Sequence, residues 1–207
     1  HADLGIELAS EHSGRTTSHV TARDNLVSFG TIVGISIGGY ANGVGGTDHC
    51  SIVNNTLFEN DTSKSGSGEF QVQFHASNNV FANNILYANA QGLLVNSFVA
   101  ANTAPAAMDH NLYDTANGPS AAQWVWEHKT YRTLAAFQTT SAGEAGGLLA
   151  DPKFTSTAPA TFDLHLASGS PGIDSGNHPG LASEGLFDFD GNARVDGAAI
   201  DRGAYER

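Results

Sequence analysis

Short apolar runs with a period of two recur along this chain, separated by glycine, asparagine and serine. Four of them form one series with apolar residues two positions apart, at 5–8, 34–37, 70–73 and 92–95. Such alternation predicts short β-strands that bury one face. An array of βαβ units would need amphipathic segments of ten or more residues between the strands. The sequence contains none before residue 119, so the chain is predicted to be all-β.

An asparagine recurs at a nearly constant spacing, at Asn25, Asn55, Asn84 and Asn111. A repeat of about 30 residues with several short strands cannot bury its apolar face alone, so successive copies must stack. The asparagine amide has both donors and an acceptor, and it can pair with an identical side chain one coil away. The pattern therefore predicts an asparagine ladder at one turn of a solenoid.

These repeats predict a right-handed parallel β-helix of about four to six coils, with residues 1–118 forming the coils. Residues 119–207 are expected to continue the same solenoid as strands, a short helix and an irregular C-terminal cap. We expect a strand at 123–126 and a helix over 130–138, capped by Thr130. Further strands are expected at 151–154, 162–166, 170–174 and 200–205, shielding the edge of the last coil.

The first predicted strand begins almost at the N-terminus, without a capping element before it. This suggests the C-terminal part of a longer protein. The first coil should then expose an open edge and the apolar residues Ile6, Leu8, Val20 and Leu26. A second copy could cover this surface, which predicts an end-to-end homodimer.

Composition narrows the classes of partner. Acidic residues outnumber basic ones by 21 to 9, giving a formal charge of −12, which should repel nucleic-acid phosphates and anionic lipids. No apolar run is long enough to insert into a membrane. The single cysteine, Cys50, excludes an intramolecular disulfide and is expected to be buried.

The asparagine positions and the Asn-Asn pairs resemble those of bacterial right-handed parallel β-helix proteins of the pectin-lyase-like superfamily. The C-terminal motifs Gly-Ser-Pro-Gly-Ile-Asp at 169–174, Asp-Phe-Asp-Gly-Asn at 188–192 and Asp-Arg-Gly-Ala-Tyr-Glu at 201–206 are similar to the ending of its choice-of-anchor subgroup. The resemblance implies an exported or cell-surface protein. It also implies polysaccharide hydrolase, lyase or epimerase chemistry in a lateral groove, although a fold by itself does not fix a function.

The same strand series predicts a polar outer face. If Ile6 and Leu8 point inward, then Glu7 points outward, and the same rule directs Ser36, Gln71, Gln73 and Leu94 outward. The adjoining loops add Glu11, His12, Arg15, Tyr40, Glu69 and His75. A polar face with one aromatic ring suits a sugar, but an ordinary solvated sheet face has the same composition.

Glycoside hydrolysis needs two carboxyl groups about 5 Å apart for retention or about 6.5–9.5 Å apart for inversion. Glu7 and Glu69 lie two coils apart, close to the upper limit, and Glu11 could shorten that distance. A lyase would instead need a base and a cation, supplied by arginine, lysine or calcium. The segment Asp188-Phe-Asp190-Gly-Asn192 resembles the start of a calcium loop, but its glycine is misplaced for an EF-hand and no distal glutamate fits the spacing, so a structural turn is favoured over a cation site.

The leading hypothesis is an exported carbohydrate-active protein with Glu7, Glu11 and Glu69 as catalytic candidates. Its candidate sugar contacts are Arg15, Tyr40, Gln71, Gln73 and His75. The nine histidines form no metal-binding motif, and His19, His49 and His110 are assigned to turns or coil edges. The alternative is a non-catalytic glycan-binding or structural surface module, either whole or as a fragment of a longer β-helix protein. Close carboxyl groups in a cleft would favour the enzyme, whereas a flat solvated face would favour the module.

Overall fold

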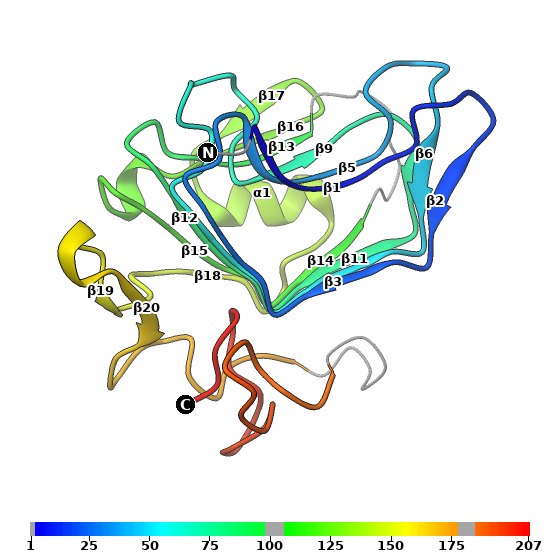
Figure 1. Cartoon of the computed structure of the whole chain (residues 1–207). Helices are drawn as coiled ribbons and strands as arrows, with labels where there is room; N and C mark the ends of the chain where they lie inside the picture. Colours follow the sequence, from blue (N-terminus) through cyan, green and yellow to red (C-terminus); the bar gives the residue numbers. More distant parts are fainter. Residues whose placement is uncertain (1–2, 98–105, 178–184) are drawn as a thin grey trace.

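The computed structural model describes residues 3–97, 106–177 and 185–207, which form a parallel β-solenoid of about four turns with one short α-helix. Figure 1 shows the coils stacked on one another, with equivalent strands superimposed. The predicted all-β solenoid is therefore confirmed. Hydrogen bonding in four sheets satisfies the backbone groups, because each strand pairs with the equivalent strand of the next coil.

The four sheets run along the solenoid axis. Sheet A contains, in spatial order, β1 (Leu4–Leu8), β5 (Val33–Ile37), β9 (Phe70–Val72), β13 (Leu93–Ser97), β16 (Gln123–Trp126) and β17 (Lys129–Tyr131). Sheet B contains β10 (Ala76–Ser77), β6 (Gly46–Asp48) and β2 (Thr16–Ser18). Sheet C contains β14 (Ala106–Asp109), β11 (Asn79–Ala82), β7 (Ser51–Val53) and β3 (Thr21–Arg23). Sheet D contains β18 (Leu148–Leu149), β15 (Leu112–Thr115), β12 (Ile85–Ala88), β8 (Thr56–Phe58) and β4 (Leu26–Ser28).

The core consists of columns of apolar side chains that follow the strand register. One column in sheet A contains Ile6, Ile35, Phe70, Val95 and Trp124. A second column in sheet C contains Ala22, Ile52, Phe81 and Met108. The columns meet across the core, where the Phe70 and Phe81 rings stack with their centroids 3.8 Å apart. Cys50 is fully buried, as expected.

The asparagine ladder is present as predicted. The Nδ2 atom of Asn25 donates to Asn55 Oδ1 at 2.8 Å, Asn55 donates to Asn84 at 2.9 Å, and Asn84 donates to Asn111 at 3.0 Å. The left-handed backbone, however, belongs to the residue before each ladder asparagine, since Asp24, Asn54, Asn83 and His110 have φ values between 53° and 57°. The asparagine doublets therefore place one residue at the turn and the next in the ladder.

The C-terminal end of the stack is covered by β17 and α1 (Leu134–Ser141). β17 pairs antiparallel with β16, and the Phe137 ring of α1 stacks on Trp124 at 5.6 Å. The helix begins four residues later than expected. Its N-cap is Thr133, whose side chain accepts a hydrogen bond from Ala136 N. Thr130 cannot cap the helix, because it belongs to β17 and pairs with Val125 of β16.

Residues 168–177 and 185–207 contact the side of the solenoid, at the turns of several coils, and not the edge of the last coil. They follow the 3₁₀ turns η1 (Pro119–Ala121) and η2 (Pro159–Thr161) and the antiparallel hairpin of β19 (Phe154–Ser156) and β20 (Asp163–Leu166). The segments 170–174 and 200–205 were expected to be strands, but both form turns and bends.

We call residues 185–207 the C-terminal strap. Figure 1 shows it, in orange and red, beneath the corner where sheets C and D meet. Its contacts pass from the fourth coil to the first: Arg202 with Asn111, Gly203 with Asn83, Ala204 with Thr56, and Arg194 with Asp24. The strap thus connects coils that are far apart in the sequence.

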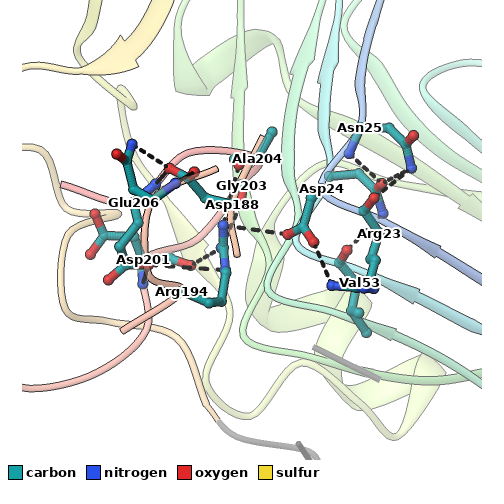
Figure 2. Close-up of polar contacts among 12 residues, drawn as sticks. Arg23, Asp24, Asn25, Val53, Asp188, Arg194, Asp201, Gly203, Ala204 and Glu206 are labelled. Carbon is teal, nitrogen blue, oxygen red and sulfur yellow. Dashed lines mark hydrogen bonds and ion pairs between the residues drawn. The ribbon is translucent and has the colours of Figure 1, made fainter. Parts of the chain in front are cut away.

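Arg194 anchors the strap to the first coil and is only 2% exposed. Its Nη2 donates to the carbonyl oxygens of Asp201 and Gly203 at 2.9 and 2.7 Å, and its Nη1 lies 3.4 Å from Asp24 Oδ1. Figure 2 shows the guanidinium between Asp24 and the acidic residues of the strap. Burial raises the pKa of Asp24 to about 6 despite the neighbouring arginines, and raises that of Glu206 to about 7.

Candidate functional site

The polar row predicted on sheet A exists, but a loop covers its middle. Glu7, Ser36, Gln71 and Asn96 lie side by side in register, and of these only Glu7 is exposed. The loop at 61–68 folds over the others: Gln71 Nε2 donates to Ser67 Oγ, and Asn96 Nδ2 donates to Gly66 O. The predicted open groove on this sheet is therefore absent from the described part of the second and third coils.

Asp61 holds that loop in place from a buried position. Its carboxylate accepts hydrogen bonds from the backbone N–H groups of Ser65, Gly66, Ser67 and Gly68, at distances of 2.6–3.1 Å. Such a ring of amides satisfies a buried carboxylate. The loop is thus a rigid cover on the sheet.

Leu94 does not belong to the outward row, contrary to the expectation. The register of β13 shifts between Leu93 and Val95, so that Asn96 pairs with Gln71 in the row and Leu94 lies buried in the core. A β-bulge adds one residue and changes which side chains face outward. Strict alternation therefore failed at this strand.

Glu69 is not on an exposed face either. It is fully buried, and its carboxylate accepts hydrogen bonds from Asn60 N at 2.8 Å and Asn60 Nδ2 at 2.6 Å. Burial raises the pKa of Glu69 to about 8, against the lowering effect of those two donors. A carboxyl group held in the interior cannot reach a polymeric substrate, so Glu69 is corrected from a catalytic candidate to a structural residue.

Glu7 and Glu11 lie together at the N-terminal edge of sheet A, and both are exposed. The pKa of Glu7 is raised, first by partial burial and then by the negative charge of Glu11. The structure thus brings these two predicted residues together and separates both from Glu69.

Arg15 and His75 line one small hollow of about 240 Å³, together with Ser13, Thr16 and four glycines. Tyr40 is 57% exposed and does not line it. Gln73 donates to Gln71 at 2.9 Å, beside the covered row. The five predicted sugar contacts therefore divide among three places.

A larger hollow, of about 720 Å³, lies on the outer side of sheet C at the C-terminal end of the stack. Its polar lining includes His49, Asn78, Asn79, Asp109 and Ser141. Its apolar lining comes from Val80, Ala106, Ala107, Met108 and the alanines at 142 and 145. Sequence reasoning missed this site, because it joins two strands of sheet C to the segment 141–145, with which they share no repeat. The Asn78-Asn79 doublet was the available signal.

His49 and Asn78 line the larger hollow, and both contact the neighbouring Asp48. His49 Nδ1 lies 2.6 Å from Asp48 Oδ2, while Asn78 Nδ2 donates to Asp48 Oδ1 at 2.8 Å. These hydrogen bonds, that of Asn78 first, lower the pKa of Asp48 to about 2. The Asp48 carboxylate is therefore ionised and holds the His49 ring and the Asn78 amide at fixed positions. His19, His49 and His110 all lie at turns with positive φ, as expected.

Glu144 closes the inner wall of the larger hollow and ends the asparagine ladder. It is fully buried, and its Oε1 accepts from Asn111 Nδ2 and from the Tyr113 hydroxyl, both at 2.6 Å. Burial raises the pKa of Glu144 to about 7, and the charge of Asp109 adds to this effect. Because those donors occupy its carboxylate, we assign Glu144 to the ladder.

The suspected calcium loop at 188–192 is a structural turn. The Asp188 carboxylate accepts from the backbone N–H groups of Asp190, Asn192 and Glu206. The Asp190 carboxylate instead contacts His165 Nε2 at 2.8 Å. Donors therefore occupy the oxygens that a cation would need. Within the described residues, no group of three or more histidine, cysteine or acidic side chains is arranged to hold a metal ion.

Comparison with known proteins gives one named relative, "Uncharacterized protein YwoF" from Bacillus subtilis (strain 168), which is 31% identical over 169 residues. The match covers 82% of this chain and 35% of the relative, so the chain spans about a third of the relative's length. No family model matches the chain, and no solved structure matches it. Among the described residues, no helix has the length and apolar character needed to cross a membrane.

Proposed function

We propose that this protein binds a polysaccharide at the larger hollow on sheet C, as an exported or cell-surface member of the pectin-lyase-like β-helix proteins. The observation that carries the proposal is the mixed lining of that hollow, in which imidazole, amide and carboxylate groups face an apolar wall. The ladder and the C-terminal motifs support the assignment to the superfamily.

The lining suits a sugar for two reasons. Sugar hydroxyl groups need both donors and acceptors, which His49, Asn78 and Asp109 provide, while the apolar side of a pyranose can lie on Val80 and Ala107 in the outward row of sheet C. Asp109 also brings a negative charge. We therefore expect a neutral glycan to bind better than a uronate.

A steric block on sheet C tests the proposal. Ala107 and Thr21 are both exposed and lie in the same outward row of sheet C, but only Ala107 lines the hollow. Ala107→Trp should weaken binding to a panel of neutral and acidic polysaccharides at least about tenfold. Thr21→Trp is the matched control and should leave affinity unchanged. Binding is measured by affinity electrophoresis and calorimetry; equal affinity of both variants would refute the location, and no binding by the native chain would refute the function.

Cleavage at the first coil is a second candidate, favoured by the proximity of Glu7 and Glu11. A carboxyl group with a raised pKa beside a second carboxyl group is the arrangement of a general acid with its partner. Glu7 would donate the proton to the leaving oxygen and Glu11 would serve as base or nucleophile.

An activity screen separates the two candidates. Reducing ends and unsaturated products are measured separately, with and without calcium, for the native chain and for Glu7→Gln and Glu11→Gln. Loss of product in both variants, with binding retained, would support cleavage by this pair. Unchanged product formation would exclude the pair, and absence of product would leave binding as the function.

A further inference from the structure

Two Asn-Gly pairs occur in this chain, and each follows an alanine, at 41–43 and at 116–118. In such a pair the backbone nitrogen of the glycine can attack the side-chain amide of the asparagine, because glycine has no side chain that hinders the approach. The attack needs an asparagine side chain that is free to turn and a base that removes the proton of the glycine N–H. The structure distinguishes the two pairs by these requirements.

Asn42 and Gly43 are the central residues of an exposed turn between β5 and β6. Val44 N donates to Ala41 O at 3.1 Å and closes this turn, and Gly43 has a φ of 94°. Both central residues are exposed, and no heavy atom lies within 4 Å of the position that a Gly43 Cβ would occupy. The Asn42 side chain makes no hydrogen bond to any described residue, so it is free to turn toward the Gly43 nitrogen.

His75 reaches this turn from the next coil. Gly43 N donates to His75 Nε2 at 3.4 Å, so this ring nitrogen carries a lone pair and the neutral imidazole has its proton on Nδ1. The backbone holds the ring there, because His75 has a left-handed φ of 56° and its carbonyl oxygen accepts from Thr47 N at 3.1 Å. A neutral imidazole that contacts an N–H group is placed as a general base for its proton.

The pair of Asn117 and Gly118 has neither feature. Gly118 N donates to Thr115 O at 2.8 Å, and a carbonyl oxygen is not a base that can accept this proton. Asn117 Nδ2 donates to Ala90 O at 3.0 Å, and Asn117 N donates to Thr115 Oγ1 at 3.3 Å. Both reacting groups of this pair are therefore held by hydrogen bonds.

We propose that Asn42 is a self-modifying site, which converts to aspartate and isoaspartate with His75 as the catalytic base. His75 Nε2 takes the proton from Gly43 N, and this nitrogen forms a bond to Asn42 Cγ. The bond from Cγ to Nδ2 then breaks, and His75 returns the proton to the leaving nitrogen, which departs as ammonia. Water opens the resulting succinimide at either carbonyl carbon. The step consumes only water, and it is independent of the proposed glycan site.

The modification would change the small hollow that Arg15, Gly43 and His75 line. Either product adds a carboxylate at position 42, next to this lining. Isoaspartate also adds a methylene group to the backbone of the turn. An aged chain should therefore differ from a new one in charge and in the shape of this loop.

The reaction can be followed in the whole chain. The protein is incubated at mildly alkaline pH, both folded and unfolded in urea, and conversion at each asparagine is measured by proteolytic digestion and mass spectrometry. Enzymatic methylation of isoaspartate identifies the second product. Asn117 is the matched control within the same chain. The variant is His75→Asn, which removes the imidazole and keeps a residue that tolerates the left-handed backbone; circular dichroism checks its fold.

In the folded native chain, Asn42 should convert at least about tenfold faster than Asn117. His75→Asn should slow conversion of Asn42 at least about fivefold and leave Asn117 unchanged. In urea the two asparagines should convert at similar rates, and Asn42 should be slower there than in the folded chain, a comparison that needs no variant. Equal rates of Asn42 and Asn117 in the folded chain would overturn the proposal. A folded Asn42 rate below that in urea, or one that His75→Asn leaves unchanged, would also overturn it.

Discussion

Asn84→Ala tests whether the ladder stabilises the solenoid. The Asn84 side chain takes part in four hydrogen bonds: two donated, to Ile52 O and Asn111 Oδ1, and two accepted, from the backbone N and Nδ2 of Asn55. Every partner lies within the buried stack. Removing the amide leaves the Asn55 N–H without an acceptor in the interior.

The magnitude follows from this count. A net contribution of about 1 kcal/mol per bond, with the desolvated N–H added, predicts a loss of about 3–5 kcal/mol in the free energy of unfolding. Asn25→Ala is the matched control, because Asn25 is the half-exposed end rung and its side chain accepts nothing among the described residues. We expect a loss of about 1 kcal/mol or less there.

Urea unfolding followed by fluorescence measures both variants, since Trp124 and Trp126 are buried at the end of the stack. The slope of free energy against urea must agree between the variants, because solenoids can unfold in parts. An Asn84→Ala loss no larger than that of Asn25→Ala would refute the view that ladder hydrogen bonds, and not apolar stacking alone, hold the coils in register.

Three further predictions concern other parts of the fold. Arg194→Met should cost about 3–5 kcal/mol of unfolding free energy, because it leaves buried carbonyl and carboxylate oxygens without a partner, whereas the exposed Arg132→Met should change little in the same urea assay. Burial raises the pKa of Glu69 from 4.5 to about 8, so the folded state binds this proton more strongly than the unfolded state does. The stabilisation is lost as the pH rises from about 5 through 8, so the thermal midpoint should fall over that interval. Glu69→Gln should flatten this dependence. Thr133→Ala should lower helix stability by about 1 kcal/mol through loss of the N-cap, and Thr130→Ala should not, as judged by thermal circular dichroism.

The repeating part of the fold could be predicted from sequence because its signals are local and periodic. The spacing of Asn25, Asn55, Asn84 and Asn111 fixes the coil length, and alternation in Ile6 to Leu8 fixes the inward face. The strap follows no repeat. Its position depends on single hydrogen bonds such as that from Gly203 N to Asn83 O, which no pattern in the sequence signals.

The site was less predictable for the same reason. A glutamate such as Glu69 is usually found at the surface. Here the backbone N–H and the side-chain amide of Asn60 both donate to its carboxylate and make its burial tolerable. Glu7 and Glu11 were found together because they are close in sequence. The larger hollow was missed, because its wall at 141–145 meets Asp109 only through tertiary contacts such as Gly146 N to Asp109 Oδ1.

The strap also sets an order of events during synthesis. Arg194 meets Asp24 only after 170 further residues have been made, and Ala204 meets Thr56 across a separation of 148. Coils can form as they emerge from the ribosome, since their contacts span about one repeat, but the contacts that join all four coils form only after residues 194–204 have been made. Until then Asp24 remains hydrated. A chain that stops before Arg194 therefore has the sheets and the asparagine ladder between its coils but lacks the strap contacts that join the first coil to the fourth.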